Sequence, residues 1–306
     1  MTMLHIPDSN SGTVNYKGRS MNRVIYILVC LCIMVASCEK PGFEDVTQKG
    51  RTVIECDIES LLFEDSERVW PQGAMIGVFG SEKGKNTPFH LRNADSNLTR
   101  GEFYGQEVSG SQIAAYYPYG PAYTSTPDGF PVSLSPMQEY APDKPLNVFL
   151  KHCPKAFAFM TNESLRFEYP FGMLCFRVEL EETVTVNKVV VRAQQALAGS
   201  GKVSSGGLSL DAGAPESSVL DCKNTLSRDE QGNVVDFYMV VVPGLYQRLE
   251  VEFYVDGETT PLYCIVNGAD IPRVGAENFS LLSVIVKGSG PEGFVSEKVE
   301  FDEEEE

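Results

Sequence analysis

Apolar and polar residues alternate along several short segments of the chain, and no segment shows long helical periodicity. Residues 53–58 and 249–255 alternate most regularly, so that every second side chain faces a core while its neighbours face water. Residues 185–192 and 234–242 are rich in β-branched side chains, which favour strands. The pattern therefore predicts an all-β protein.

Further strands are predicted where short apolar runs lie between turn signals, at residues 75–79, 112–117, 146–150, 173–180, 261–266 and 280–286. Asp256-Gly257 lies between two predicted strands, and both residues tolerate positive φ, so the pair predicts a hairpin turn. The seven prolines from Pro118 to Pro145 predict instead a long irregular loop.

The spacing of the predicted strands, about eight to fifteen residues, is typical of β-sandwiches. A chain of 306 residues has about twice the length of an ordinary domain, so we expect two sandwiches in tandem. We place an N-terminal β-sandwich domain at residues 51–164 and a C-terminal one at residues 165–288. Residues 289–306 form an acidic tail.

The N-terminus has the pattern of an export signal. Arg23 precedes twelve apolar residues at 24–35, fewer than the roughly 20 that a spanning helix needs but typical of a signal peptide. The following Val35-Ala36-Ser37-Cys38 resembles the bacterial lipobox, in which a peptidase cuts before the cysteine and the thiol receives lipid. We therefore expect cleavage between Ser37 and Cys38 and lipid attachment at Cys38.

Two alternatives stay open at this end of the chain. The apolar run could be a buried strand that contains cysteine, and the polar residues 1–20 precede Met21, which could be the true start. On the lipoprotein interpretation, residues 1–37 are an upstream segment and signal peptide, and residues 38–50 are a flexible tether. The protein is then exported and anchored at the outer membrane, facing the cell surface.

The net charge of the chain excludes some classes of binding partner. Its 25 Lys and Arg against 42 Asp and Glu give a net charge of −17. This excess of acid excludes the basic footprint of a nucleic-acid-binding protein and argues against electrostatic attachment to anionic lipid. Covalent lipid is the membrane attachment that we expect.

Residues with catalytic or metal-binding chemistry are few. His90 and His152 are the two histidines after the signal peptide, and neither has a metal ligand at the usual spacing. The run Gly199-Ser200-Gly201-Lys202 is followed by Val203 instead of the serine or threonine of a phosphate loop, and it predicts a turn. We expect no enzymatic activity, no cofactor and no metal site.

Cysteine and tyrosine residues are the other candidates for a functional role. Five cysteines follow Cys38, an odd number without Cys-x-x-Cys, so we expect small buried side chains and no disulfide framework. An aromatic cluster beside the proline-rich segment either offers a stacking platform for sugar rings or packs into turns and core. Its members are Tyr116, Tyr117, Tyr119 and Tyr123.

Several motifs, in this order, resemble the fimbrillin-like lipoproteins of Bacteroidales. The lipobox comes first, followed by WPQG at residues 70–73 with IGVF at 76–79, and then by AAYYPY at 114–119. In the second half, VVVP at 240–243 before the predicted hairpin adds to the resemblance. Ala74 departs from it, because an aspartate is common at that position.

The resemblance implies two transthyretin-like β-sandwich domains and a role as a stalk, tip or anchor subunit of a fimbrium. It also implies that a protease cutting after Arg or Lys removes an N-terminal strand, and that a strand of the next subunit fills the groove. By position, Arg51 and Arg68 are candidate cut sites. The candidate exchange strand is marked by Val53, Ile54, Cys56 and Ile58.

Other interpretations remain open. The two arginines could be ordinary surface residues of an anchored monomer that does not polymerise. The protein could instead be a surface lipoprotein that binds a glycan or host ligand through its tyrosines. A hydrolase would need His90 or His152 beside an activated nucleophile.

Overall fold

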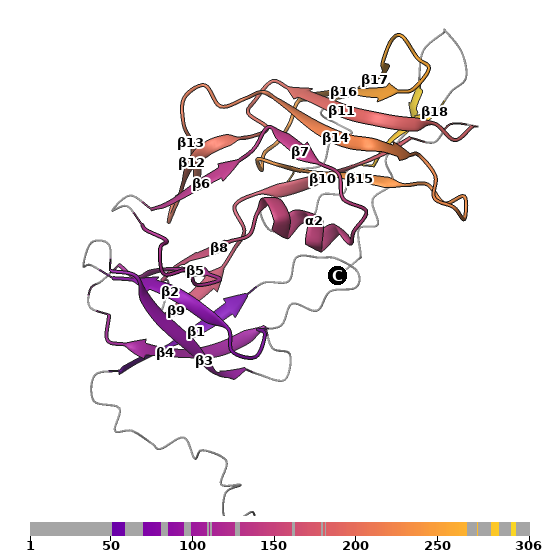
Figure 1. The fold of residues 1–306 in the computed structure, drawn as a ribbon. Helices are drawn as coiled ribbons and strands as arrows, with labels where there is room; N and C mark the ends of the chain where they lie inside the picture. The colour runs from indigo at the N-terminus through magenta and orange to yellow at the C-terminus, as the bar shows by residue number, and fades with distance from the viewer. Residues whose placement is uncertain are drawn as a thin grey trace, which may run out of the picture. The chain divides into compact units, whose positions relative to one another are not determined.

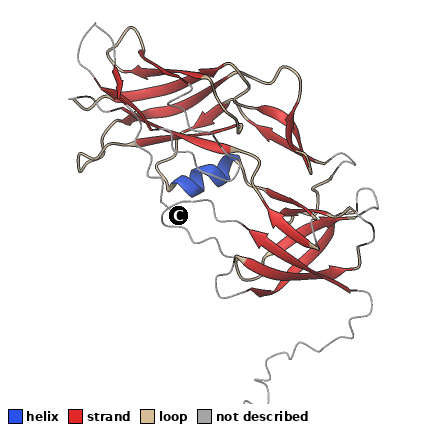
Figure 2. Cartoon of the chain, turned by 180° about the vertical axis from the view of Figure 1, so that it is seen from behind, coloured by secondary structure: helices blue, strands red, loops and turns tan. Residues whose placement is uncertain are grey.

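A computed structural model describes residues 51–58, 70–80, 85–94, 99–108, 110, 112–125, 129–160, 163–178, 180, 182–267, 274, 283–287 and 295–297. Within these ranges strands dominate, as Figure 2 shows, and α2 (Pro145–His152) is the one helix. The predicted all-β fold is confirmed. The signal peptide, Ser37, Cys38, the tether, Arg68 and most of the acidic tail lie outside the described residues.

One sheet is built from residues 51–167 (Figure 1). Its two edge strands also meet at a bridge, where Phe157 and Glu168 exchange backbone hydrogen bonds of 2.8 and 2.9 Å. The sheet therefore closes on itself in the manner of a barrel. Its order is β8 (Ala156–Phe159), β5 (Ala114–Tyr117), β2 (Met75–Phe79), β3 (Thr87–Ala94), β4 (Arg100–Gln106), β1 (Arg51–Ile58) and β9 (Ser164–Phe167).

Three further sheets come mainly from later residues. The four-stranded sheet has the order β15 (Asp236–Val241), β10 (Gly172–Val178), β18 (Ser283–Lys287) and β19 (Val295–Glu297). The five-stranded sheet has the order β17 (Leu262–Asn267), β16 (Arg248–Val255), β11 (Thr185–Ala193), β14 (Ser217–Leu226) and β7 (Met137–Glu139). The three-stranded sheet has the order β13 (Gly207–Leu210), β12 (Gly199–Ser204) and β6 (Phe130–Leu134).

The four- and five-stranded sheets share one apolar core. Every second residue of β16, from Leu249 to Val255, is buried, and the residues between them are partly exposed. These side chains belong to the same buried cluster as Phe176 of β10 and Val191 of β11. Two sheets whose inner faces meet in this way form a β-sandwich, the architecture that the strand spacing predicts.

Strands and core residues cross the predicted domain boundary at 164/165. β9, which begins at that boundary, pairs with β1 in the seven-stranded sheet. β6 and β7 precede the boundary, yet they pair with β12 and β14, which follow it. The core of the seven-stranded sheet likewise includes Ala198, Val240 and Val242. The two parts of the chain therefore complete each other's sheets and cores.

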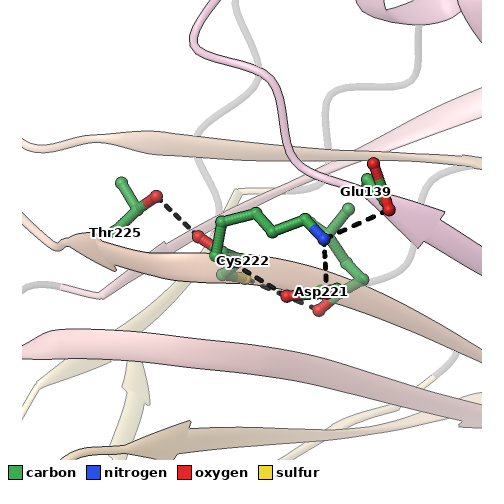
Figure 3. Close-up of polar contacts among 6 residues, drawn as sticks. Glu139, Asp221, Cys222 and Thr225 are labelled. Atoms are coloured by element: carbon green, nitrogen blue, oxygen red, sulfur yellow. Dashed lines mark hydrogen bonds and ion pairs between the residues drawn. The ribbon is translucent and has the colours of Figure 1, made fainter.

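Two polar side chains hold β7 in place. The Lys223 ammonium lies 3.1 Å from a Glu139 carboxylate oxygen and 2.9 Å from that of Asp221, contacts drawn in Figure 3. Gln138 is buried, and its side-chain amide donates to the Val240 carbonyl (2.6 Å) and accepts from the Val240 N–H (2.9 Å). The Gln138 amide thus pairs with edge strand β15 as a neighbouring strand would, and it satisfies buried backbone groups.

Residues 146–150 belong to α2, so the strand predicted there is wrong. Pro145 begins the helix, where its missing N–H costs no hydrogen bond. Val148 and Phe149 are the fully buried residues of α2. Five mostly apolar residues fit a strand as well as a short helix, and periodicity over so short a run does not separate the two.

Two loop predictions are also wrong. The proline-rich segment contains β6 and β7. Pro131 lies on β6, which is an edge strand of the three-stranded sheet, and an edge strand tolerates the missing N–H of proline. Residues 199–202 begin β12 instead of forming a turn. A Cβ at Gly201 would lie 2.2 Å from the Ser209 carbonyl oxygen, so glycine lets β12 and β13 approach at this point.

The predicted hairpin at Asp256-Gly257 is confirmed. β16 and β17 are antiparallel on either side of it, and Gly257 has a φ of +83°. The five described cysteines are buried, as predicted. Among the described residues no helix combines the length and apolar character needed to cross a bilayer.

Candidate functional site

The structure gives β1, the candidate exchange strand, a neighbour on each side. β1 pairs antiparallel with β4 from Arg51 to Asp57. It pairs parallel with β9 from Glu55 to Ile58. We call the space that β1 occupies between β4 and β9 the β1 slot. The second half of β1 is thus a central strand with backbone partners on both sides.

Alternate side chains of β1 fill the core of the seven-stranded sheet. Ile54 is 2% exposed, Cys56 0% and Ile58 5%, and all three belong to one buried cluster. Val53 points the other way and is 44% exposed. The buried face of β1 therefore consists of two isoleucines with a small residue between them.

Trp70 covers the middle of the β1 slot. Its indole N–H donates to the Cys56 carbonyl at 3.3 Å, and the indole is buried. The centroid of its ring lies 4.8 Å from that of Phe103, 5.0 Å from that of Tyr117 and 5.5 Å from that of Phe167, each in an edge-to-face arrangement. Because Trp70 binds the backbone of β1 directly, its environment reports whether β1 is in place.

Gly101 lies opposite Cys56 in the β1–β4 ladder. A Cβ at Gly101 would meet Leu91 Cδ1 at 2.8 Å and Trp70 Cδ1 at 3.0 Å. Glycine at this position therefore makes room for the indole beside β1. Cys56 is 0% exposed, so a larger side chain at its position would have to displace the residues packed around it.

The Cys56 thiol is expected to be unreactive. Burial raises its pKa far above the ordinary value, and the nearby Asp57 and Glu55 carboxylates raise it further. A thiol that stays protonated is a poor nucleophile and a poor metal ligand. Cys56 therefore contributes packing to the site, and we assign it no chemistry.

Arg51 begins β1 at the surface. It is paired with Gln106 in the ladder, and its guanidinium carbon lies 5.7 Å from the centroid of the Tyr104 ring. Asp57, near the other end of β1, forms an ion pair of 3.1 Å with Arg100 of β4. Both ends of β1 thus have polar contacts with β4 in addition to the ladder.

The structure separates the four candidate tyrosines. Tyr116 is buried in a cluster with Phe130, and Tyr123 packs against Tyr116 at a centroid distance of 4.4 Å. Tyr117 instead packs against Trp70, on the other side of β5. Tyr119 is half-buried, and its N–H donates to the Met75 carbonyl. The four rings therefore do not form one exposed platform.

The two histidines also lie apart. His90 is exposed on β3, with its ring centroid 5.8 Å from that of Tyr104. His152 is half-buried at the end of α2, and its Nε2 has no hydrogen-bond partner among the residues that the structure describes. Within the described part of the chain no three His, Cys, Asp or Glu side chains are grouped to hold a metal ion.

Sequence reasoning missed Trp70 and Gly101 as parts of the β1 slot. Trp70 is visible in the sequence as the single tryptophan of the chain, within the WPQG block. Its partner Cys56 lies 14 residues away across the segment 59–69, so no local pattern joins the two. Gly101 carries no sequence signal of its own.

Comparison with known proteins places the chain near several solved structures. A candidate cell adhesion protein from Bacteroides ovatus ATCC 8483 is 17% identical over 81% of this chain and 95% of that chain, with a TM-score of 0.49. A second one, from Bacteroides uniformis ATCC 8492, is 15% identical over 78% and 94%, with a TM-score of 0.46. A fimbrial protein from Bacteroides ovatus ATCC 8483 is 12% identical over 78% and 50%, with a TM-score of 0.34.

No family model matches the chain, and no curated protein matches it.

Proposed function

We propose that the protein is a cell-surface subunit of a fimbrium that joins other subunits by β-strand addition, with β1 as the strand that is exchanged. The β1 slot carries the proposal, because β1 lies between β4 and β9 and fills the core with alternate apolar side chains. A replacement strand would gain affinity from backbone hydrogen bonds and specificity from the pockets. The ordered sequence motifs support the same class of protein.

The two candidate cut sites have different consequences for β1. A cut after Arg51 leaves residues 52–58 joined to the rest of the chain, so the strand stays in place. A cut after Arg68 separates β1 from β2, and only pairing and packing then hold it. Arg51 is also paired in a ladder, whereas proteases act on locally opened segments. We therefore propose Arg68 as the maturation site.

The geometry of the slot specifies the replacement strand. It must run antiparallel to β4 and parallel to β9. It needs large apolar side chains at the positions of Ile54 and Ile58 and a small one at the position of Cys56, under Trp70. A strand with a bulky central residue would overpack this buried position.

Export and lipid attachment at Cys38 are further parts of the proposal, and no catalytic step is included. They account for the apolar run and lipobox and would place the subunit at the outer membrane. Mass spectrometry of the membrane fraction should show a mature chain that begins at lipid-modified Cys38. A Cys38→Ala chain should lose the lipid and leave the membrane fraction. Unmodified Cys38 in membrane-bound protein would contradict the assignment.

Protease treatment tests strand exchange directly. We expect an Arg-specific protease to convert the purified mature protein into oligomers and to release a fragment that contains β1. Light scattering measures the increase in molar mass. Arg51→Gln should behave like the unmodified protein, and Arg68→Gln should stay monomeric. Trp70 fluorescence, from the single tryptophan, should shift when β1 leaves.

One outcome would refute strand exchange. A chain that is cut after Arg68, keeps β1 and remains monomeric cannot polymerise by this route. The alternative function, a surface lipoprotein that does not polymerise and binds a glycan or host ligand, would then become the better explanation. Binding to a glycan array by the uncut protein would test that alternative.

A further inference from the structure

Lys155 is a lysine whose ammonium group lies inside a ring of aromatic and backbone groups. Its Nζ donates to the Pro118 carbonyl at 2.9 Å. It lies 4.7 Å from the centroid of the Tyr116 ring and 4.9 Å from that of Tyr123. A Cβ built on Gly120 would lie 3.9 Å from the same nitrogen. The ammonium of half-buried Lys155 therefore lies against one short loop, residues 118–123, and the end of β5.

The contacts of Lys155 involve no carboxylate among the residues that the structure describes. Burial is the cause that lowers the pKa of Lys155. A half-buried ammonium is costly unless its surroundings stabilise the charge. Two aromatic faces and a carbonyl supply that stabilisation, and this is the arrangement by which aromatic cages bind ammonium ligands.

The walls of this enclosure are held together without Lys155. The Tyr116 hydroxyl donates to the Gly120 carbonyl at 2.6 Å and accepts from the Gly120 N–H at 3.0 Å. The side-chain amide of Asn86 donates to the Tyr116 hydroxyl (2.9 Å), the Gly120 carbonyl (2.9 Å) and the Tyr123 carbonyl (3.1 Å). The Tyr123 hydroxyl donates to the Pro131 carbonyl at 2.8 Å.

We propose that residues 118–123 with Tyr116 form a binding site for a primary ammonium group, which the chain fills with its own Lys155. The faces of Tyr116 and Tyr123 that the sequence suggests as a sugar platform are then occupied from within. The site is closed to free amines in the intact protein and opens when Lys155 is shortened. This inference does not depend on strand exchange.

Chemical rescue tests the proposal on the full mature chain. Lys155→Ala should lower the midpoint of thermal unfolding by about 5 °C, as expected when a desolvated cation–π contact is lost from a domain of this size. Propylammonium chloride replaces the missing atoms. It should restore at least half of the loss, with saturation on the order of millimolar concentrations. Propan-1-ol and sodium chloride should not.

Three variants separate the ammonium from simple packing. Lys155→Met keeps the apolar stem and fills the space, so it should lose stability without being rescued. Lys188→Ala is the matched control, because exposed Lys188 lies 4.1 Å from the centroid of a single ring, that of Tyr254, and should show a small loss and no rescue. Adding Tyr123→Leu to Lys155→Ala should abolish the rescue.

The proposal is overturned if Lys155→Met is as stable as the unmodified protein, or if propylammonium acts equally on the Lys188→Ala control. If Lys155→Ala does not fold, the rate of reductive methylation of the unmodified protein tests whether Lys155 fills the site. We expect dimethylation of Lys155 to be slower than that of Lys188 even though its lowered pKa leaves more of the reactive neutral amine, because an amine held against two rings must open before it reacts. Equal rates would show that the site is not filled, and they would refute the proposal.

Discussion

β1 and β16 have the same length and nearly the same pattern, yet the chain holds them differently. Each has eight residues with alternate ones buried. β16 has antiparallel partners on both sides, and residues 256–261, with a turn at Gly257, join it to one of them. β1 has partners that are distant in sequence, and it pairs with β9 over only four residues. Local pattern makes both of them strands, and connectivity is the reason why we propose β1, and not β16, as the strand that is replaced.

The largest expected effect comes from Phe253→Ala in β16. Truncating a fully buried aromatic ring should lower the free energy of unfolding by about 4 kcal/mol. Since Phe253 packs in the core of the sandwich, release of β1 after proteolysis should proceed at an unchanged rate. Urea denaturation followed by circular dichroism measures the first quantity, and release of the β1 fragment the second. Faster release would mean that the two cores are not separable.

Ile54→Ala should have the next largest effect on stability and, unlike Phe253→Ala, should also speed the release of β1. Loss of a buried isoleucine costs about 3 kcal/mol, and here the lost contacts are those that hold β1 in its slot. We expect faster release of the cut fragment together with lower stability. Val53→Ala, next to it but exposed, is the matched control and should change stability by less than about 0.5 kcal/mol. Equal effects of the two variants would contradict the assigned faces of β1.

Trp70→Phe should cost about 1–2 kcal/mol, because the phenyl ring keeps much of the packing but cannot donate to the Cys56 carbonyl. The fragment should leave faster than from the unmodified protein and more slowly than from Ile54→Ala. Since the variant has no tryptophan, a dye on the cut fragment measures its release. A release rate equal to that of the unmodified protein would show that the indole does not hold β1.

The smallest expected effect is a pH dependence that comes from α2. Burial lowers the pKa of His152, Lys151 lowers it further, and Glu139 partly opposes them. The folded state therefore favours the neutral ring. Its contribution to stability is complete above the ordinary pKa of 6.5 and declines as the pH falls through the folded-state pKa. His152→Gln should flatten this acid-side decline in urea titrations, with release of β1 unchanged. A decline that persists in His152→Gln would assign it to other groups.

Several features could be predicted from the sequence because their physical cause is local. Alternation over 53–58 and 249–255 predicts β1 and β16, and Asp256-Gly257 predicts the hairpin, since the period of a strand and the φ of a turn depend on adjacent residues. The strand predicted at residues 146–150 was wrong because the segment is too short for its apolar pattern to distinguish a strand from a helix. β6 and β7 were missed because prolines at an edge look like a loop.

The sequence by itself determined the strand-rich class of this protein, the buried face of β1 and the buried state of its cysteines. Only the tertiary structure decided that β1 lies between β4 and β9, that Trp70 and Gly101 meet beside Cys56, and that Lys155 lies against the rings of Tyr116 and Tyr123. The reason is that register and enclosure depend on contacts between residues far apart in the chain. These contacts are set by the packing of whole sheets, and no local pattern of side chains records them.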